Sequence, residues 1–252
     1  MAQTDKIEVI IRRQESSKAE SRYETFAVDN QPGLNVISIL QSIAADPRTI
    51  DGRQTTPVAW ECSCLEEVCG ACTMVINGRV RQACAALVEK IPERPIRIEP
   101  MKTFSVVRDL IVDRKKMFEA LKAVKAWVPI DGTHDLGAGP RYSARVQEIR
   151  YRLSECMTCG CCAEACPQYN DATGFLGPAA VAQVQLFNCH PTGAFTQSER
   201  LDAMMGPGGL HNCGNAQACV EVCPKNIPLT DAIAEVGRQL TVHSVKRLLG
   251  FS

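Results

Sequence analysis

The sequence lacks the features of membrane-spanning, secreted or nucleic-acid-binding proteins. No stretch approaches the ~18 consecutive apolar residues that a bilayer-crossing helix needs. The N-terminal MAQTDKIEVI has neither the apolar core nor the cleavage site of a secretory signal. Its 28 basic residues balance its 28 acidic ones, so no nucleic-acid partner is expected. We therefore expect a chain that is soluble by itself and reaches a membrane only through a partner.

Signatures of substrate-transforming enzymes are also missing. The sequence holds no Rossmann-type or P-loop glycine pattern and no nucleophile elbow. Its four histidines, at positions 134, 190, 211 and 243, are scattered along the chain, which favours surface or capping roles over catalysis.

Fourteen cysteines are the dominant positive feature. They gather into three short groups, Cys62 to Cys84, Cys156 to Cys166 and Cys213 to Cys223, with Cys189 alone. Intervals of two or three residues let thiolates converge on one metal centre but do not suit unstrained disulfides. The pattern therefore favours metal ligation over disulfide bonding.

The cysteines lie in two kinds of structural context. Strands are predicted at Lys6–Arg13, Tyr23–Val28, Met74–Ile76 and Pro95–Glu99, and a helix from Val36 to Ile43. The Asn77-Gly78 pair predicts a hairpin turn.

From Thr103 to about Arg150 the chain changes character, with an amphipathic helix marked by Met117, Leu121, Val124 and Val128. The Gly/Pro-rich segment Asp131–Pro140 is predicted to be a linker or surface loop. A further helix is predicted where Ile227, Ile233, Val236 and Leu240 recur.

The first group has the spacing C-x4-C-x2-C…C at Cys64, Cys69, Cys72 and Cys84. This is the plant-type ferredoxin pattern for a [2Fe–2S] cluster. Gly70 lies inside the loop, where the lack of a Cβ allows close backbone approach. Cys62 fits no position of the pattern and is interpreted as a plain small side chain.

The second and third groups resemble each other. Cys156, Cys159, Cys162 and Cys166 form the bacterial run C-x2-C-x2-C-x3-C, followed by a proline. The last group repeats this run at Cys213, Cys219 and Cys223, again followed by proline, with Ala216 in place of one cysteine.

In two-cluster ferredoxins the fourth cysteine of each run ligates the other cluster. This rule assigns Cys156, Cys159, Cys162 and Cys223 to a [4Fe–4S] cluster. It leaves only Cys166, Cys213 and Cys219 for the other cluster, which is therefore predicted to be [3Fe–4S]. Cys161 is expected to pack beside a cluster and Cys189 in the core, while His211, two residues before Cys213, is placed to tune a cluster potential.

These observations predict an α+β fold. A plant-type ferredoxin (β-grasp-like) domain with [2Fe–2S] is expected at residues 1–105 and a helical linker at 106–145. An all-α bacterial-ferredoxin-like domain with the other two clusters is expected at 146–252.

The order of these motifs resembles the iron–sulfur subunit of succinate dehydrogenase and fumarate reductase. The resemblance covers nearly the whole chain and includes the text at Ser63–Gly78, Glu99–Phe104, Val107–Leu110 and Gly177-Pro178. Its details look most similar to the Bacillus-like branch that works with menaquinone.

The resemblance implies a succinate:quinone oxidoreductase in which a partner flavoprotein with FAD oxidises succinate. Electrons would pass singly through the [2Fe–2S], [4Fe–4S] and [3Fe–4S] clusters to a quinone at a membrane-anchor cytochrome that carries haem b. The chain itself would lie peripherally on the cytoplasmic face of the cell membrane, held by the anchor.

Family members with a quinone site beside the [3Fe–4S] cluster use a proline, a tryptophan and a histidine there. Pro167 matches the proline, but Gly214 stands at the histidine position and no tryptophan follows Pro167. The sequence therefore favours quinone chemistry elsewhere in the anchor, reached through haem.

Other hypotheses stay open at this stage. The chain could be the iron–sulfur subunit of a quinol:fumarate reductase, of a thiol-linked fumarate reductase or of a heterodisulfide reductase. It could also be a free-standing multi-cluster carrier. A zinc-stabilised interaction module is the alternative from a class without redox chemistry.

Overall fold

The computed structural model describes residues 5–128 and 141–250, and within these ranges the chain forms two compact units. The first unit comprises the described residues up to Arg114 together with Met157–Glu164. The second comprises the described residues between Lys115 and Cys156 and those from Ala165 onward. The predicted loop Asp131–Pro140, with His134, lies outside the described residues.

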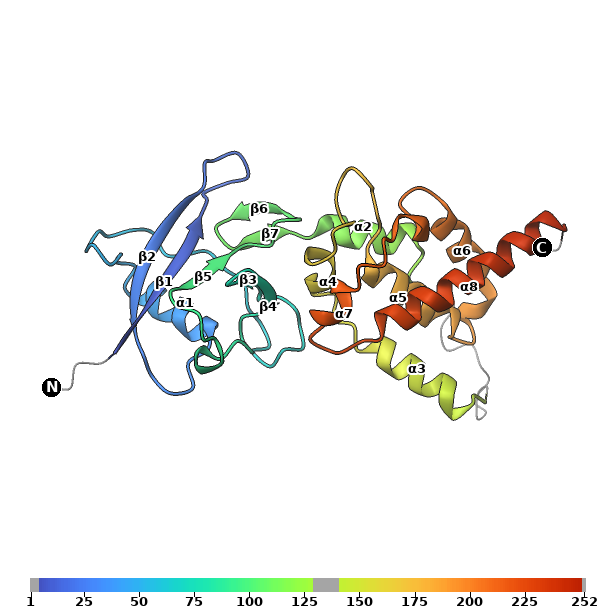
Figure 1. Cartoon of the computed structure of the whole chain (residues 1–252), viewed down its shortest axis with the longest axis horizontal. Coiled ribbons are helices and arrows are strands. Elements are labelled where there is room, and N and C mark those ends of the chain that lie inside the picture. The colour runs from blue at the N-terminus through green and yellow to red at the C-terminus, as the bar shows by residue number, and fades with distance from the viewer. Residues whose placement is uncertain (1–4, 129–140, 251–252) are drawn as a thin grey trace. The chain divides into compact units, whose positions relative to one another are not determined.

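A five-stranded mixed sheet in the order β2-β1-β5-β3-β4 forms the frame of the first unit (Figure 1). β1 runs parallel to β5, and the other pairings are antiparallel. Alternate residues of β1, namely Ile7, Val9 and Ile11, are buried, as expected for a strand that turns one face to a core. The strands are β1 (Lys6–Arg13), β2 (Arg22–Asp29), β3 (Thr73–Ile76), β4 (Arg79–Gln82) and β5 (Ile96–Glu99).

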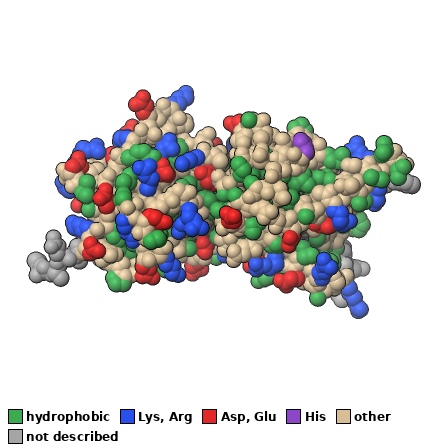
Figure 2. All heavy atoms as spheres, viewed as in Figure 1, with side chains coloured by type: hydrophobic (Ala, Val, Ile, Leu, Met, Phe, Trp, Pro, Cys, Tyr) green, Lys and Arg blue, Asp and Glu red, His purple; other side chains and the backbone are tan. Residues whose placement is uncertain are grey.

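One helix, α1 (Val36–Ala45), shares its core with this sheet. Its buried side chains include Val36, Leu40 and Ile43, the positions that the sequence periodicity predicted. The side chain of Asn35 caps the helix by accepting a hydrogen bond from Ser38 N at 2.9 Å. A short 3-10 turn, η1 (Val88–Lys90), and the one-turn helix α4 (Cys161–Glu164) also belong to this unit. On the face that Figure 2 shows, basic and acidic side chains are interspersed over it.

A small second sheet differs from the sequence prediction. Residues 105–113, expected to begin a helical region, instead form the paired strands β6 (Ser105–Arg108) and β7 (Ile111–Asp113). The turn between them is fixed from outside the hairpin. Asp109 accepts hydrogen bonds from Arg13 Nε at 3.0 Å, Gln14 N at 3.0 Å and Ala59 N at 2.9 Å. Because these partners are distant in sequence, the residues of the turn carry no local pattern that would predict it.

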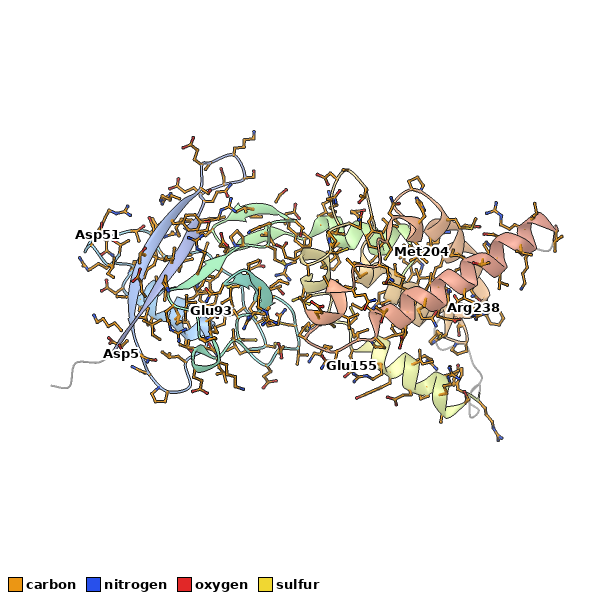
Figure 3. The ribbon with its side chains drawn as sticks, in the orientation of Figure 1. Asp5, Asp51, Glu93, Glu155, Met204 and Arg238 are labelled. Atoms are coloured by element: carbon orange, nitrogen blue, oxygen red, sulfur yellow. The ribbon has the colours of Figure 1, made fainter. Side chains whose placement is uncertain are left out.

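The second unit is helical, as predicted, and from residue 115 onward the described residues form no strand. Its apolar core includes Phe175, Val184, Met204 and Val236 (Met204 is labelled in Figure 3). No helix among the described residues is both long and apolar enough to span a bilayer. The helices are α2 (Lys115–Ala123), α3 (Ala144–Ser154), α5 (Pro178–Asn188), α6 (Gln197–Met205), α7 (Ala218–Glu221) and α8 (Leu229–Leu248), with 3-10 turns η2 (Gly193–Thr196) and η3 (Leu210–Asn212).

Two helices are shorter than the periodicity of the sequence predicts. α2 ends at Ala123, so Val124 and Val128 lie beyond it, and α8 begins at Leu229, so Ile227 precedes it. Val124 and Ile227 are buried all the same, because an apolar side chain can pack whether or not its backbone is helical.

Candidate metal centres

The β3–β4 hairpin brings the last two cysteines of the first group together. Cys72 immediately precedes β3, and Cys84 lies two residues after β4. The Asn77-Gly78 turn, with φ of 47° and 76°, reverses the chain so that Thr73 pairs with Gln82. Ala83 N donates to Cys72 O at 3.1 Å and closes the open end of the hairpin. Both cysteines are buried, and their thiols share a hydrogen bond.

The first two cysteines of the group lie in an exposed loop whose backbone N–H groups point at sulfur. Cys64 Sγ accepts from Glu66 N at 3.4 Å, Val68 N at 3.3 Å and Cys69 N at 3.3 Å. Cys69 Sγ accepts from Cys64 N and Ala71 N, each at 3.5 Å. Such a nest of N–H donors stabilises negative charge on sulfur.

The electrostatics of Cys64 and Cys84 differ. Hydrogen bonds from Glu66 and Val68 lower the pKa of Cys64 to about 7. Burial and the neighbouring Cys72 raise the pKa of Cys84 to about 11. The structure therefore presents a half-buried Cys64 that is stabilised as thiolate and a buried Cys84 that needs bound positive charge to ionise.

Part of the second group belongs to the first unit. Cys159 and Cys161 are buried and Cys162 is half-buried, on a turn with positive φ at Thr158 (51°) and Gly160 (90°). A hydrogen bond from the Cys161 thiol lowers the pKa of Cys159 to about 7. The same hydrogen bond, together with burial, raises the pKa of Cys161.

The turn is anchored beyond its cysteines. The Glu164 carboxylate accepts from Lys102 N and Thr103 N, both at 2.9 Å, and from Thr103 Oγ1 at 2.6 Å. A Cβ on Gly160 would lie 3.4 Å from Met101 Sδ, so the backbone packs closely there.

Gly70 shows why the first loop needs a glycine. Its φ is +73°, and an added Cβ would lie 2.7 Å from Cys159 Cβ. Arg114 holds this part of the loop, donating to Gly70 O and Ala71 O, each at 2.7 Å. The loop of the first group thus lies directly against the backbone of Cys159.

The remaining cysteines belong to the second unit. Cys166, Cys213 and Cys219 line one cavity, together with Ala216 at the position of the missing cysteine. Burial raises the pKa of Cys166 and Cys219, with a smaller contribution from their charge interactions with one another and with Cys213. A cavity lined by three thiols, with an alanine at the fourth corner, fits a cluster that lacks one iron.

The structure places the other predicted residues as follows. Pro167 is exposed and lines the same cavity, and His211 is exposed in η3. A Cβ on Gly214 would lie 3.0 Å from Gln168 Nε2. Cys62 is exposed, and Cys189 is half-buried, where it accepts from Gln185 Nε2 at 3.2 Å.

Cys156 and Cys223 belong to the second unit, whereas Cys159 and Cys162 belong to the first. The four-cysteine set for [4Fe–4S] therefore stays a prediction. Within the second unit, Cys223 Sγ accepts from Ile227 N at 3.5 Å, so this sulfur too faces a backbone donor.

Sequence reasoning missed the residues that shape the three loops. Leu65, Glu67, Thr158, Asn215 and Gln217 all have positive φ between 51° and 62°. These conformations turn successive N–H groups inward, as in an anion-binding nest. The only local signal is the asparagine, a residue that tolerates this region better than most.

The donor set discriminates between kinds of metal centre. Within residues 5–128 and 141–250, no three His, Cys, Asp or Glu side chains are close enough to share a single metal ion. The thiols of the first loop instead pair two by two, which suits a group that offers a separate iron to each pair. A multi-iron cluster fits this arrangement better than one tetrahedral zinc ion.

Comparisons with known proteins agree with this chemistry. A model described as a 2Fe-2S iron-sulfur cluster binding domain matches residues 6–119. A model described as a 4Fe-4S dicluster domain matches residues 152–227. The predicted fold class, an N-terminal plant-type ferredoxin domain followed by a helical domain of the bacterial-ferredoxin kind, is confirmed.

Individual relatives align over most of the chain. The succinate dehydrogenase iron-sulfur subunit of Bacillus subtilis (strain 168) is 53% identical over 99% of this chain and 98% of its own length. The fumarate reductase iron-sulfur subunit of Mycobacterium tuberculosis is 31% identical, over 89% of this chain and 90% of its own length. A chain of the Mycobacterium smegmatis Sdh1 complex in the apo form shares the fold, with a TM-score of 0.75 at 24% identity over 94% of this chain and 96% of its own length.

Proposed function

Because this chain belongs to the family of succinate dehydrogenase and fumarate reductase iron–sulfur subunits, we propose that it is the electron-transfer subunit of a succinate:quinone oxidoreductase. One observation carries the proposal. Two different cluster-binding domains lie on a chain that aligns over 99% of its length with a succinate dehydrogenase subunit.

The proposed ligand sets follow the spacing of the cysteines. Cys64, Cys69, Cys72 and Cys84 bind [2Fe–2S]; Cys156, Cys159, Cys162 and Cys223 bind [4Fe–4S]; Cys166, Cys213 and Cys219 bind [3Fe–4S]. When bound, the clusters supply one-electron redox chemistry. The N–H donors at the Cys64 and Cys69 sulfurs support the first set, and the cavity around Ala216 supports the third.

One-electron centres suit the proposed reaction. Oxidation of succinate to fumarate releases two electrons and two protons, which we assign to a FAD-containing flavoprotein partner. This chain then holds the electrons one at a time. Its backbone donors stabilise the negative charge that reduction adds near sulfur, and burial of Cys72 and Cys84 keeps water from one side of the centre.

The membrane contact is assigned to a second partner, a membrane-anchor cytochrome with haem b, on the cytoplasmic face of the cell membrane. No described helix of this chain could span the bilayer. Pro167 is the residue proposed to face the quinone side. Because Gln168 lies against Gly214, where other family members place a histidine, we place quinone reduction within the anchor, with menaquinone as the acceptor.

Stepwise reduction of the purified complex tests the proposal. Electron paramagnetic resonance (EPR) of the oxidised complex is expected to show the [3Fe–4S] signal. Addition of succinate is expected to reduce part of the cluster population, and dithionite the remainder. Absence of iron–sulfur signals, or clusters that dithionite reduces but succinate does not, would contradict the proposed role.

A quinol:fumarate reductase is the second candidate, favoured by the 31% identity to the Mycobacterium tuberculosis fumarate reductase subunit. Such an enzyme would bind its clusters through the same cysteines, but electrons would flow from quinol to fumarate. Comparison of succinate oxidation with a quinone acceptor and fumarate reduction with a quinol donor, in the same membranes, distinguishes the two.

A further inference from the structure

A half-buried arginine, Arg114, donates to two successive carbonyls of the first cysteine loop. Its terminal nitrogens lie 2.7 Å from Gly70 O and 2.7 Å from Ala71 O. These two residues form the short link between Cys69 and Cys72, and Gly70 is buried. Arg114 directly follows β7 and belongs to the first unit, as the loop does. The structure therefore holds a full positive charge against a loop that is proposed to bind [2Fe–2S].

One peptide group lies between this charge and a cysteine sulfur. The C=O of Gly70 and the N–H of Ala71 belong to the same planar unit. Its oxygen accepts from Arg114 and, at 2.8 Å, from Thr73 Oγ1. Its N–H donates to Cys69 Sγ at 3.5 Å. Because the sulfur is the acceptor, this hydrogen bond is compatible with Cys69 binding iron as a thiolate.

A cation at the oxygen end of a peptide strengthens the hydrogen bond at its nitrogen end. Hydrogen bonds that are joined in series polarise one another, and the effect is larger where water is partly excluded. Net charge and hydrogen bonds to the sulfurs are two of the factors that set the potential of an iron–sulfur cluster. Arg114 contributes to both, since it adds a positive charge and polarises the peptide that donates to Cys69. Both contributions favour the reduced state, which carries one more negative charge.

The hydrogen bonds to the two carbonyls satisfy Arg114 only in part. Its Nε is buried and has no hydrogen-bond partner. An unpaired buried N–H costs free energy, and a carbonyl needs only a neutral N–H donor. An amide side chain would serve such carbonyls without burying a charge, so the positive charge is the property that distinguishes Arg114 at this place.

Resting on the proposed function, we propose that Arg114 raises the reduction potential of the [2Fe–2S] cluster. Arg114 is a positioning residue: it ligates no iron, and it acts through its charge and through the peptide between Gly70 and Ala71. The electron that the proposed flavoprotein delivers adds one negative charge at this loop and moves no atom or proton. Because Arg114 stabilises that charge, succinate reduces a larger fraction of the [2Fe–2S] population.

Arg114→Gln in the intact complex is the first test. The variant removes the charge but keeps an amide that can donate to a carbonyl. Redox titration followed by EPR measures the midpoint potential of [2Fe–2S]. At a fixed solution potential we expect the ratio of reduced to oxidised cluster to fall about tenfold, which is about 59 mV for a one-electron couple. Iron and sulfide content should stay at the wild-type level, and the fraction that succinate reduces should fall.

Two further variants separate charge from hydrogen bonding. Arg114→Lys keeps the positive charge on a different donor, and its potential should lie closer to wild type than that of Arg114→Gln. Arg94→Gln is the matched control, because Arg94 lies in the same unit and also donates to carbonyls, those of Val88 and Glu93, at 3.0 Å each. It removes an arginine whose partners lie outside the cysteine loop, and it should leave the potential unchanged.

The titration decides the proposal. A wild-type [2Fe–2S] potential in Arg114→Gln overturns it, and so does a fall of the same size in Arg114→Lys or Arg94→Gln. Loss of the cluster from Arg114→Gln also overturns it, since Arg114 would then be needed to hold the loop rather than to set its potential. Dithionite and mediators drive the titration, so its result does not depend on succinate. A wild-type complex whose clusters succinate cannot reduce would contradict the proposed function instead.

Discussion

Ala216 stands at the position where the preceding cysteine run has its second cysteine, and it lines the same cavity as Cys166, Cys213 and Cys219. Ala216→Cys adds a fourth thiolate where three are proposed to hold iron. We expect conversion of the [3Fe–4S] cluster toward [4Fe–4S], seen as loss of the oxidised-state EPR signal. Ala218→Cys, two residues away and on the same cavity, is the control and should leave the signal intact. A full-strength signal in Ala216→Cys would show that this cluster has other ligands.

The three cysteines outside the ligand sets differ in burial. Cys62 is exposed, Cys161 buried and Cys189 half-buried. Their replacement by serine, one at a time, should leave all three clusters assembled, because none of them is a proposed ligand. Iron and sulfide content together with EPR measures this. The loss of any cluster from one of these variants would identify an overlooked ligand.

Residue spacing locates the cysteines well, but not their surroundings. Spacing within one group predicts which thiols can converge, because the loop that joins them is short, and the ferredoxin rule then pairs the second group with the third. The contact of Gln82 with Cys161 joins residues 79 apart, and it depends on how the hairpin and the turn pack. No local pattern carries that information.

At the scale of elements, a comparison of Gly70 with Gly78 distinguishes the cost of a left-handed backbone from the cost of steric crowding. Both have positive φ, 73° and 76°, but an added Cβ meets Cys159 only at Gly70 and has open space at Gly78. Gly78→Ala is expected to cost about 1–2 kcal/mol, the price of a side chain in the left-handed region. Gly70→Ala should cost more and lower [2Fe–2S] occupancy. Thermal unfolding and visible absorbance measure both, and equal effects would argue against the close contact.

Arg13 joins β1 to two other elements. Its guanidinium pairs with Glu24 on β2 and with Asp109 in the β6–β7 turn, and all three side chains are at most 2% exposed. Arg13→Leu removes the buried cation that Glu24 and Asp109 share and leaves them only exposed arginines nearby, which is expected to cost about 3–5 kcal/mol of unfolding free energy. Arg48→Leu, which removes an exposed pair with Asp46, should cost at most about 1 kcal/mol. Chemical denaturation checks the difference, and similar losses would refute the buried network.

The sequence predicts long, regular helices and strands better than short, irregular ones. β1, β2 and α1 follow from eight to ten residues of clear alternation or helical period. β6 and β7 have four and three residues, and Arg108 and Asp109 interrupt their apolar pattern. Their pairing depends on the contacts of Asp109 with distant residues, so the sequence alone suggested a helical region instead.

At the scale of the whole molecule, the borders of the two compact units do not coincide with the borders of the cysteine motifs. The predicted domain boundaries at residues 105 and 145 remain predictions, and Met157–Glu164 packs with the first unit although it lies in the second cysteine group. The contacts responsible are those of Glu164 with Lys102 and Thr103 and of Gly160 with Met101. A cysteine run is thus shared between two units, a division that cysteine spacing does not reveal.

Membrane attachment tests the division of roles among the proposed subunits. No helix among the described residues can cross a bilayer, so the proposed attachment depends on the anchor. In cells that lack the anchor subunit, we expect this chain to move from the membrane pellet to the supernatant, still able to bind the flavoprotein. Cell fractionation with immunodetection measures the shift, and restoring the anchor on a plasmid is the control. Retention in washed membranes without the anchor would show that this chain has a membrane contact of its own.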